Sequence, residues 1–441
     1  MRLTIRIQMR LSVLALAALL LSAGASAQAV LKAGAARLDI TPTTDEMAAP
    51  FKTVADHVYV RVLVLDDGTQ RVVIAIADAP TIAAKVAADL AQRIASTAHV
   101  PAENVLLGST HTHNTMRVDG SGMGSSLPGS TKYLDHVVNA TMSALDQALK
   151  NMQPARAGYG VGSAALIANR NQWNESEHRW IEGIDRTGTQ PIDRRLGVLK
   201  VESMDGRPIA FLLNYGMEPV VAMAMQGQIS GDVPGAASRY VEDRYNGNAV
   251  AIFTIGSTGS PLYRAHPGQP GGGPDPRALI SAMGTILGEE ALATANDIKT
   301  SSTGVHLGAA HQALECPGKT TTPLNLGNQC SNAPGAMTPA CIFKDQDAPP
   351  VMLNMGLMRI GDLALVEADA NVAPQLWLKL AAQSPVTNTA LVALTYGPLH
   401  YAIDDASYPL NTYEATASTA KQGCIEKGFL DGELEMLRKT R

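Results

Sequence analysis

The sequence predicts an α/β fold in which helices pack on a mixed β-sheet core. First, β-branched residues alternate through 58–66 and 71–78, and the turn residues Asp66–Thr69 between them predict a hairpin. Second, strand-like and helix-like apolar periodicities alternate along most of the chain. Third, the chain of 441 residues is 46% hydrophobic, enough for a large core, and no linker, repeat or change of composition divides residues 28–441. We therefore expect a single domain over that range.

The first half of the chain continues from the hairpin with helices and a short strand. Apolar residues recur every four positions from 80 to 97 and predict a helix, and residues 104–108 predict a short apolar strand. A Gly/Ser-rich loop at 118–130 then precedes a second helix, whose apolar stripe runs from Leu134 to Leu149.

The rest of the chain repeats this alternation. The predicted strands cover residues 195–203, 207–215, 249–255, 351–359, 362–367 and 389–396, and the predicted helices cover 234–245 and 373–382. Two long irregular stretches remain, a Gly/Pro-rich loop at 267–275 and a cysteine-bearing loop at 316–349. Loops of this length are usually functional, pinned by disulfides or disordered.

The N-terminal residues predict export. Three arginines and no acid precede an apolar run that is too short to span a bilayer, and Ala25–Ala27 has the small-x-small pattern of a cleavage site. We expect a signal peptide at residues 1–27, no transmembrane segment, and a mature protein that is periplasmic or secreted. Export permits disulfides, so structural bridges are expected around residues 316–341, with three pairings of the four cysteines open: Cys316, Cys330, Cys341 and Cys424.

Charge and composition exclude some classes of partner. Without residues 1–27 the chain has 32 basic and 40 acidic residues, a net charge of -8, which argues against binding of nucleic acid by phosphate neutralisation. Aromatic residues make up 4%, which argues against stacking platforms for single strands or sugars.

The strongest local signal is Thr110-His111-Thr112-His113, at the end of a predicted strand. Side chains two positions apart on a strand face the same side, so both imidazoles can meet at one point. Neutral imidazole is a good zinc ligand, and the pattern therefore predicts a metal or acid/base site. The alternative is a pair of half-exposed loop histidines.

Three further candidate site features lie near the ends of predicted strands or at the start of a predicted helix. Glu218 comes directly after an apolar strand, and Asp232 opens a predicted helix, where it either caps the helix or supports a site as a carboxylate. Residues Gly256–Pro261 are expected to form a small-residue turn that lets backbone N–H groups approach a substrate, or else a plain tight turn.

Together, a set of motifs resembles the neutral/alkaline non-lysosomal ceramidase family. The motifs are AGAARLDITP, VYVRVLVLDDG, THTH, Asn169-Arg170, DGRPIAFLLNYG, ISGDVPG, GSTGSP, IGDLALV and TYEA, in that order, between about residues 30 and 415. The resemblance implies an α/β catalytic domain that acts as a zinc amidase, in which metal-bound water attacks the ceramide amide. Family members carry a separate immunoglobulin-like domain after it, which is not expected here because the chain ends soon after TYEA.

The resemblance also implies residue roles. His111 matches a zinc ligand, His113 matches a histidine beside the metal that would carry the proton to the leaving amine, and Asn169 and Arg170 match a substrate-side pair. Tyr401 is the nearest match to the family's tyrosine ligand.

Two ligand positions depart from the family pattern. Glu218 stands where the resemblance places a histidine, and Asn371 stands where it places a glutamate. The exchange conserves the formal ligand charge and favours a harder metal. Alternatively Glu367 or Asp369 reaches the site, or the metal site is lost. The acid that the family has after Gly259 is also missing, which makes Ser260 a possible nucleophile.

The sequence therefore predicts an exported hydrolase that uses zinc or another divalent metal to activate water and cleave an amide (N-acyl) bond. The alternatives are a metal-free binding protein of the same fold and a serine-type acyl hydrolase. The substrate is expected to be a small-molecule or lipid-like N-acyl compound, with its acyl and amine parts and the oligomeric state left open. The expected residues are His113, Arg170 and Ser260 for catalysis, Asn169 and Asp232 for substrate, and His111, Glu218 and Tyr401 for metal.

Overall fold

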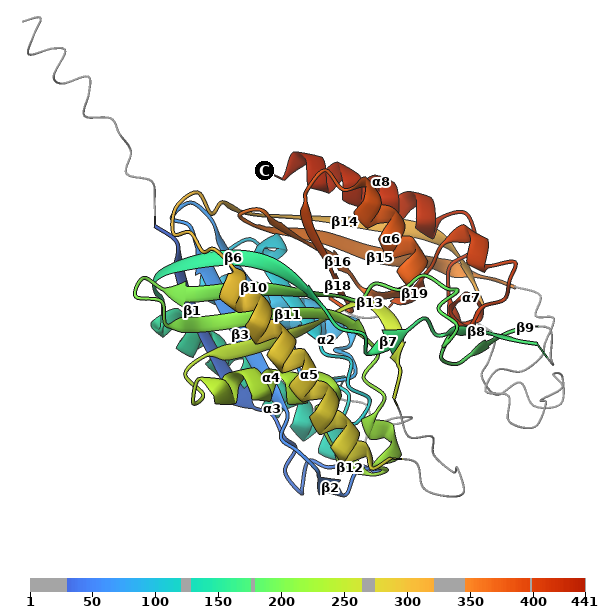
Figure 1. The fold of residues 1–441 in the computed structure, drawn as a ribbon, viewed down its shortest axis with the longest axis horizontal. Helices are drawn as coiled ribbons and strands as arrows, with labels where there is room; N and C mark the ends of the chain where they lie inside the picture. The colour runs from blue at the N-terminus through green and yellow to red at the C-terminus, as the bar shows by residue number, and fades with distance from the viewer. Residues whose placement is uncertain are drawn as a thin grey trace, which may run out of the picture.

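Two β-sheets lie face to face at the centre of the computed structural model, and helices cover both outer faces (Figure 1). The structure describes residues 30–119, 128–175, 179–263, 274–320, 346–396 and 399–440. The larger sheet has the strand order β5-β4-β3-β1-β6-β10-β11-β13-β7 and mixes parallel and antiparallel pairs. Its strands are β1 (Lys32–Asp39), β3 (Tyr59–Asp66), β4 (Arg71–Ala77), β5 (Val105–Ser109), β6 (Gln153–Ser163), β7 (Ile167–Ala168), β10 (Arg195–Ser203), β11 (Pro208–Met217) and β13 (Val250–Pro261).

Two pairs of helices cover the outer face of this sheet. Apolar side chains of α2 (Ala84–Ala98) and α3 (Pro128–Lys150) pack on the half that contains β3 and β4. Those of α4 (Asp232–Arg244) and α5 (Pro276–Asp297) pack on the half that contains β11 and β13. At Gly284 of α5 a Cβ atom would lie 2.6 Å from the Cβ of Ala236, so glycine lets α4 and α5 pack closely.

The smaller sheet has the order β14-β15-β16-β18. These strands are β14 (Leu307–Lys319), β15 (Asp347–Ile360), β16 (Leu363–Ala368) and β18 (Asn388–Ala393). One face buries apolar residues such as Leu363 and Leu365 against the larger sheet. The other packs under α6 (Pro374–Gln383) and α8 (Ile425–Lys439), which form the outermost layer in Figure 1. The predicted α/β class with a mixed sheet and packed helices is therefore confirmed.

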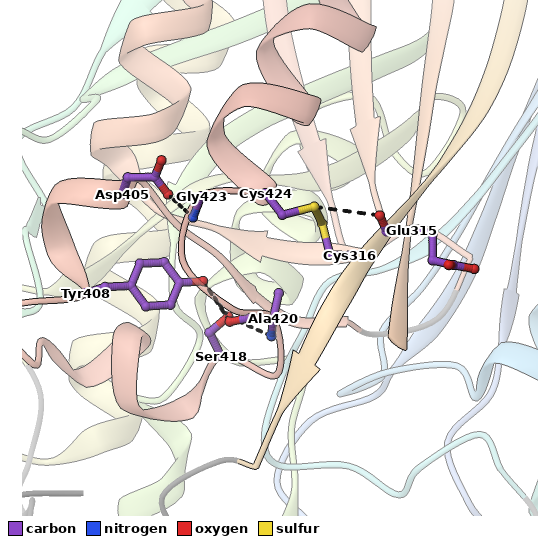
Figure 2. Close-up of a disulfide and its surroundings, with 8 residues drawn as sticks. All are labelled: Glu315, Cys316, Asp405, Tyr408, Ser418, Ala420, Gly423 and Cys424. Atoms are coloured by element: carbon purple, nitrogen blue, oxygen red, sulfur yellow. Dashed lines mark hydrogen bonds between the residues drawn. A yellow bond between two sulfur atoms is a disulfide. The ribbon is translucent and has the colours of Figure 1, made fainter. Parts of the chain in front are cut away.

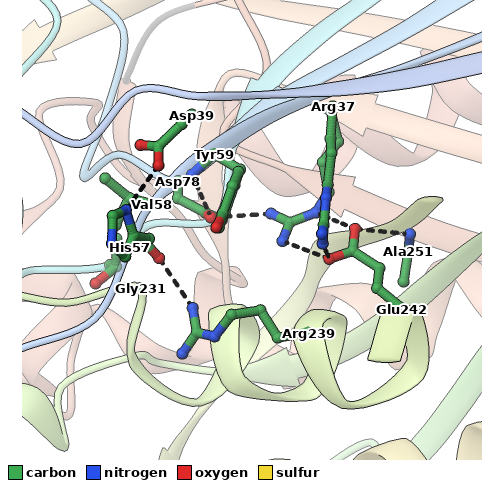
Figure 3. Close-up of polar contacts among 12 residues, drawn as sticks. Arg37, Asp39, His57, Val58, Tyr59, Asp78, Gly231, Arg239, Glu242 and Ala251 are labelled. Carbon is green, nitrogen blue, oxygen red and sulfur yellow. Dashed lines mark hydrogen bonds and ion pairs between the residues drawn. The ribbon is translucent and has the colours of Figure 1, made fainter. Parts of the chain in front are cut away.

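A buried ion network joins the N-terminal strands to α4. The Arg61 guanidinium is 2% exposed and donates to Glu242 Oε1 and Asp78 Oδ2, each at 2.9 Å. Glu242 also pairs with Arg37 and accepts from the backbone N–H of Ala251 (Figure 3). The opposing carboxylates raise the pKa of Arg61 against the effect of burial, which alone would lower it. The network fixes the end of β4, next to the segment that carries the candidate site.

A disulfide ties β14 to the start of α8. Cys316 bonds Cys424, and nearby the Tyr408 hydroxyl donates to the Ala420 carbonyl at 2.9 Å (Figure 2). One bridge at the margin of the predicted cysteine-bearing loop is thus present. Cys330 and Cys341 lie outside the described residues.

Several predictions fall outside the described residues or need correction. The proposed signal peptide and most of the loops at 118–130, 267–275 and 316–349 are not described. The turn expected at Gly256–Pro261 is wrong, because β13 continues to Pro261 and pairs there with β7. Gly259 permits that pairing, since a Cβ there would lie 2.8 Å from the Ala168 carbonyl oxygen. Within the described ranges, no helix combines the length and the apolar character that crossing a membrane requires.

Candidate metal centre

The two histidines follow β5 in a tight segment rather than on the strand itself. β5 ends at Ser109, and His111 has a left-handed backbone with φ of 60°. The Thr112 hydroxyl donates to the Ser230 carbonyl at 2.8 Å and anchors the segment. The expectation that the strand pleat aligns the imidazoles is therefore wrong in detail. A turn brings the His111 and His113 rings together, with centroids 4.7 Å apart.

Three side-chain atoms converge at this point. Glu218, which directly follows β11 and is 7% exposed, places Oε1 3.0 Å from His111 Nε2 and 3.2 Å from His113 Nε2. The two Nε2 atoms are 3.4 Å apart. Each residue thus offers one ligand atom, all within 4.8 Å of one another, so that one metal ion can reach all three.

The tautomer of His111 matters for this geometry. Its Nδ1 lies 2.7 Å from the Pro80 carbonyl oxygen, which can only accept a hydrogen bond, so Nδ1 carries a proton. In the neutral ring, Nε2 then presents a lone pair to the Glu218 carboxylate. Two lone pairs 3.0 Å apart repel unless a cation, either a proton or a metal ion, lies between them.

Charges around the cluster keep Glu218 ionised. Burial alone would raise the pKa of Glu218, but the charges of Arg170 and His111 lower it well below the ordinary value. Burial alone would also lower the pKa of His111, yet the charge and hydrogen bond of Glu218 raise it overall. The site therefore contains a permanent negative charge that attracts a cation.

The second oxygen of Glu218 is already occupied. Arg170 Nη2 donates to Oε2 at 3.0 Å, and Asn371 Nδ2 donates to the same oxygen at 3.2 Å. Asn371 comes from β17 (Ala370–Val372), the strand after β16. These two donors leave Oε1 as the free ligand atom of Glu218.

Arg170 is held from the other side as well. Its Nε lies 3.1 Å from Glu414 Oε1 in α7 (Tyr413–Ala417), and its Cζ lies 5.6 Å from the centre of the Tyr401 ring. Tyr401 belongs to β19 (Leu399–Ala402), and its hydroxyl hydrogen bonds to the Tyr413 hydroxyl at 3.4 Å. The Tyr401 ring thus packs against the Arg170 guanidinium, and the role of Tyr401 as a metal ligand stays a prediction.

The remaining predicted residues make contacts outside this group. Asn169 donates to the Pro191 carbonyl at 2.8 Å. Asp232 is fully buried, accepts from the backbone N–H groups of Ala222 and Val233, and has its pKa raised by burial to about 7. These contacts are those of a carboxylate that shapes the start of α4, and its role toward substrate stays a prediction.

Neither of the alternative carboxylates contacts the histidines. Asp369 accepts a hydrogen bond from the backbone N–H of Asn354, and Glu367 is hydrogen bonded to the Tyr396 hydroxyl. Ser260 is buried in β13 opposite Ala168, and within the described ranges no imidazole or carboxylate is hydrogen bonded to it.

Glu414 was not predicted from the sequence, although it lies in the TYEA motif. A buried glutamate in a short helix carries no local sign of its partner, and only the fold brings it to Arg170.

Comparison with known proteins supports the fold and the resemblance. Residues 47–266 match the family described as neutral/alkaline non-lysosomal ceramidase, N-terminal. Neutral ceramidases A and B of Dictyostelium discoideum are each 27% identical to this chain, over 161 and 162 residues. These alignments cover 33% and 34% of this chain and 21% of each relative, so the chain matches about a fifth of their length.

Two solved structures are similar over most of the chain. The crystal structure of neutral ceramidase from Pseudomonas aeruginosa has a TM-score of 0.74 and 17% identity, and the match covers 93% of this chain and 75% of that one. A structure titled "Ceramidase complexed with C2" has a TM-score of 0.73 and 17% identity, covering 93% and 76%. At 17% identity, this structural similarity shows that the chain has the same fold as these two proteins. The resemblance inferred from the sequence motifs is confirmed by the family match and by this fold.

Proposed function

We propose that this chain, which matches the neutral/alkaline non-lysosomal ceramidase family, is a hydrolase that cleaves an amide (N-acyl) bond with one divalent metal held by His111, His113 and Glu218. One observation carries the proposal: two imidazole nitrogens and a carboxylate oxygen converge within 4.8 Å, and His111 Nε2 lies 3.0 Å from Glu218 Oε1, a spacing that requires a proton or a metal ion between the two atoms. The family match supports the reaction class.

The residues present fit such a metal. Two imidazoles and one carboxylate are a donor set of catalytic zinc sites, which keep a fourth position open for water or substrate. The Pro80 carbonyl orients His111, and Arg170 and Asn371 orient Glu218, in the way that outer partners usually hold metal ligands. When bound, the metal would supply Lewis-acid activation of water and of the amide carbonyl.

The chain's own charges prepare the site for a cation. Arg170 carries one positive charge between the carboxylates of Glu218 and Glu414, so this buried trio has a net charge of -1. Arg170 and Asn371 hold Glu218 in one orientation through their hydrogen bonds to its Oε2. His113 is the more exposed of the two histidines, with 34% of its side chain accessible against 18% for His111, so substrate would approach from its side.

This assignment revises the role of His113. The sequence predicts a proton carrier beside the metal, whereas the His113 Nε2 lies 3.2 Å from Glu218 Oε1, almost as near as the His111 Nε2 at 3.0 Å. We propose it as the third ligand.

The substrate is proposed to be a small or lipid-like N-acyl compound. Few aromatic side chains are present to form an apolar entrance for a two-tailed lipid. We therefore propose faster turnover of short N-acyl amino acids or amines than of long-chain ceramide. The proposed signal peptide at residues 1–27 would place the protein in a periplasm or outside the cell.

A metal-free binding protein is the second candidate. The ion pairs of Arg170 with Glu218 and Glu414 place a positive charge beside both carboxylates without a metal, and a protonated His111 would complete the arrangement. The serine alternative is weaker, because Ser260 has no hydrogen-bonded base within the described residues.

Metal analysis of the purified protein separates these candidates. After incubation with zinc and removal of free metal, the wild type should hold about one ion per chain, and His111→Ala should hold almost none. His57→Ala is the matched control, because His57 is exposed and pairs only with surface groups. A wild type without metal that still hydrolyses N-acyl substrates would refute the proposal, and one without metal or activity would favour the binding protein.

A further inference from the structure

A second polar cluster lies where the two sheets meet. The Tyr396 hydroxyl hydrogen bonds to the Val105 carbonyl oxygen, lies 2.7 Å from Glu367 Oε2 and lies 3.0 Å from His311 Nε2. Glu367 is fully buried, and its Oε1 has no hydrogen-bond partner within the described residues. This cluster shares no residue with the candidate metal centre.

The hydrogen bonds of Tyr396 fix the protonation of Glu367. Tyr396 has one hydroxyl proton, and the Val105 carbonyl can only accept, so that short contact requires the proton. Glu367 must then donate to the phenolic oxygen, which it does only as a carboxylic acid. Burial raises the pKa of Glu367 to about 8, which agrees with the protonated carboxyl group that these hydrogen bonds require. His311 Nε2–H can donate to the remaining lone pair of the Tyr396 hydroxyl oxygen.

The surroundings of Glu367 also favour its neutral form. Glu433 on α8 is fully buried, and neither of its carboxyl oxygens has a hydrogen-bond partner within the described residues. Burial, and after it the charge of Glu367, raise the pKa of Glu433 well above its ordinary value, so this neighbour also favours the neutral form and brings no positive charge to Glu367. His311 on β14 lies 4.0 Å from Glu367 and is itself near Glu103, in the short 3-10 turn Ala102–Asn104. Within the described ranges, no lysine or arginine pairs with Glu367.

The cluster connects three segments that run into the candidate site. Val105 begins β5, which leads to His111, and Glu367 lies on β16, which leads to Asn371. Tyr396 precedes the strand that contains Tyr401, and its backbone N–H donates to the Leu107 carbonyl at 3.1 Å. Because β5 is an edge strand, these bonds satisfy carbonyl groups that it would otherwise leave open.

The backbone at Tyr396 is strained. Its φ is 56°, and that of Leu394 is 62°, in the left-handed region that bulky residues rarely adopt. Such conformations persist only where tertiary contacts impose them, and they are concentrated at functional sites.

We infer that Tyr396 is a positioning residue for the candidate metal centre: with protonated Glu367 it clamps β5, β16 and the segment before β19, and so holds the His111 segment in place. The inference rests on the proposed function in one respect, that the site being positioned binds a metal. When Glu367 loses its proton, the phenol proton is shared with a carboxylate, the hydrogen bond to the Val105 carbonyl weakens, and the start of β5 is released.

Hydrogen exchange and zinc titration test the clamp in the full-length protein. Tyr396→Phe should accelerate amide exchange in residues 105–113. It should also lower zinc affinity, but by less than the roughly 10- to 100-fold that loss of a direct partner of a metal ligand costs, because Tyr396 acts through the backbone of β5. Glu367→Gln keeps a neutral donor toward Tyr396, so at pH 7 it should behave like the wild type, but it should lack the additional exchange that the wild type shows above pH 8. Glu433→Gln is the matched control: it also replaces a buried acid, but outside the clamp, and should leave residues 105–113 unchanged.

The outcomes separate the clamp from the proposed function. If Tyr396→Phe leaves exchange in 105–113 at the wild-type rate, or accelerates exchange equally over the whole chain, the clamp is refuted. If the wild type binds no zinc, the proposed function fails, while faster exchange confined to 105–113 in Tyr396→Phe still supports the clamp.

Discussion

Glu218→Gln tests the central residue of the candidate site, because it removes one negative charge and keeps the shape of the side chain. Arg170, whose side chain is 5% exposed, would then keep only Glu414 as a charged partner. Removing one member of a buried ion pair typically costs about 3–5 kcal/mol. The remaining pair with Glu414 places the expected loss near the lower end, at about 3 kcal/mol.

The same variant should also lose its metal. Zinc at 100 times its Kd should stabilise the wild type by about 2.7 kcal/mol, because it binds only the folded state. Glu218→Gln should show no such gain. Glu414→Gln is the matched control, since it breaks the other ion pair of Arg170 and leaves all three proposed ligands in place, so it should be destabilised similarly but keep most of the gain from zinc.

Urea unfolding with and without zinc, together with calorimetric titration, measures both effects. If Glu218→Gln unfolds within about 0.5 kcal/mol of the wild type, Glu218 behaves as an ordinary surface residue and the assigned contacts are wrong. If the two variants respond equally to zinc, Glu218 is not a ligand.

Three further outcomes are expected. Glu367→Gln should flatten the pH dependence of stability. Between pH 4.5 and 8 the unfolded wild type releases a proton that the folded state keeps, so the wild type loses up to about 5 kcal/mol of unfolding free energy as pH rises. Urea unfolding at several pH values measures this loss, and equal slopes in both proteins would contradict it. Ser260→Ala should retain amidase activity within a few-fold, whereas complete loss with the fold intact would revive the serine mechanism. Glu218→His should favour zinc over manganese, and adding Asn371→Glu should restore affinity beyond the sum of the single changes; strict additivity in metal titrations would show that the two positions act independently.

The sequence predicts those elements in which local pattern and tertiary role agree. The strands β3 and β4 alternate β-branched residues around a turn, and both were predicted from this pattern. β6 was missed because its glycines disfavour a strand locally. Gly158 is required by packing instead, since a Cβ there would lie 2.3 Å from the Lys299 carbonyl oxygen. Because Lys299 is distant from Gly158 in the chain, this packing requirement produces no local periodicity from which the strand could be predicted.

In the candidate site, too, local sequence patterns predict some residues and leave others unpredicted. His111 and His113 are neighbours in sequence and were predicted from their spacing, and Glu218 was predicted from its place after a strand. Asn371 was identified as a departure from the family pattern, but its contact with Arg170 joins residues 201 positions apart. Nothing local in the sequence shows that Arg170 spans two carboxylates, and this feature decides which oxygen of Glu218 remains free.

The two departures from the family pattern lie in direct contact. The resemblance places a histidine at Glu218 and a glutamate at Asn371, and the structure places these side chains 3.2 Å apart. Compared with the pattern that the resemblance implies, the carboxylate in this chain stands at the end of β11 instead of on β17, and the Asn371 amide on β17 donates to it. Asparagine can donate this bond, whereas a second carboxylate beside Glu218 would add a buried like charge and disfavour ionisation of both. The two changes thus compensate each other, which is the pattern expected if the site still requires one negative charge for a bound cation.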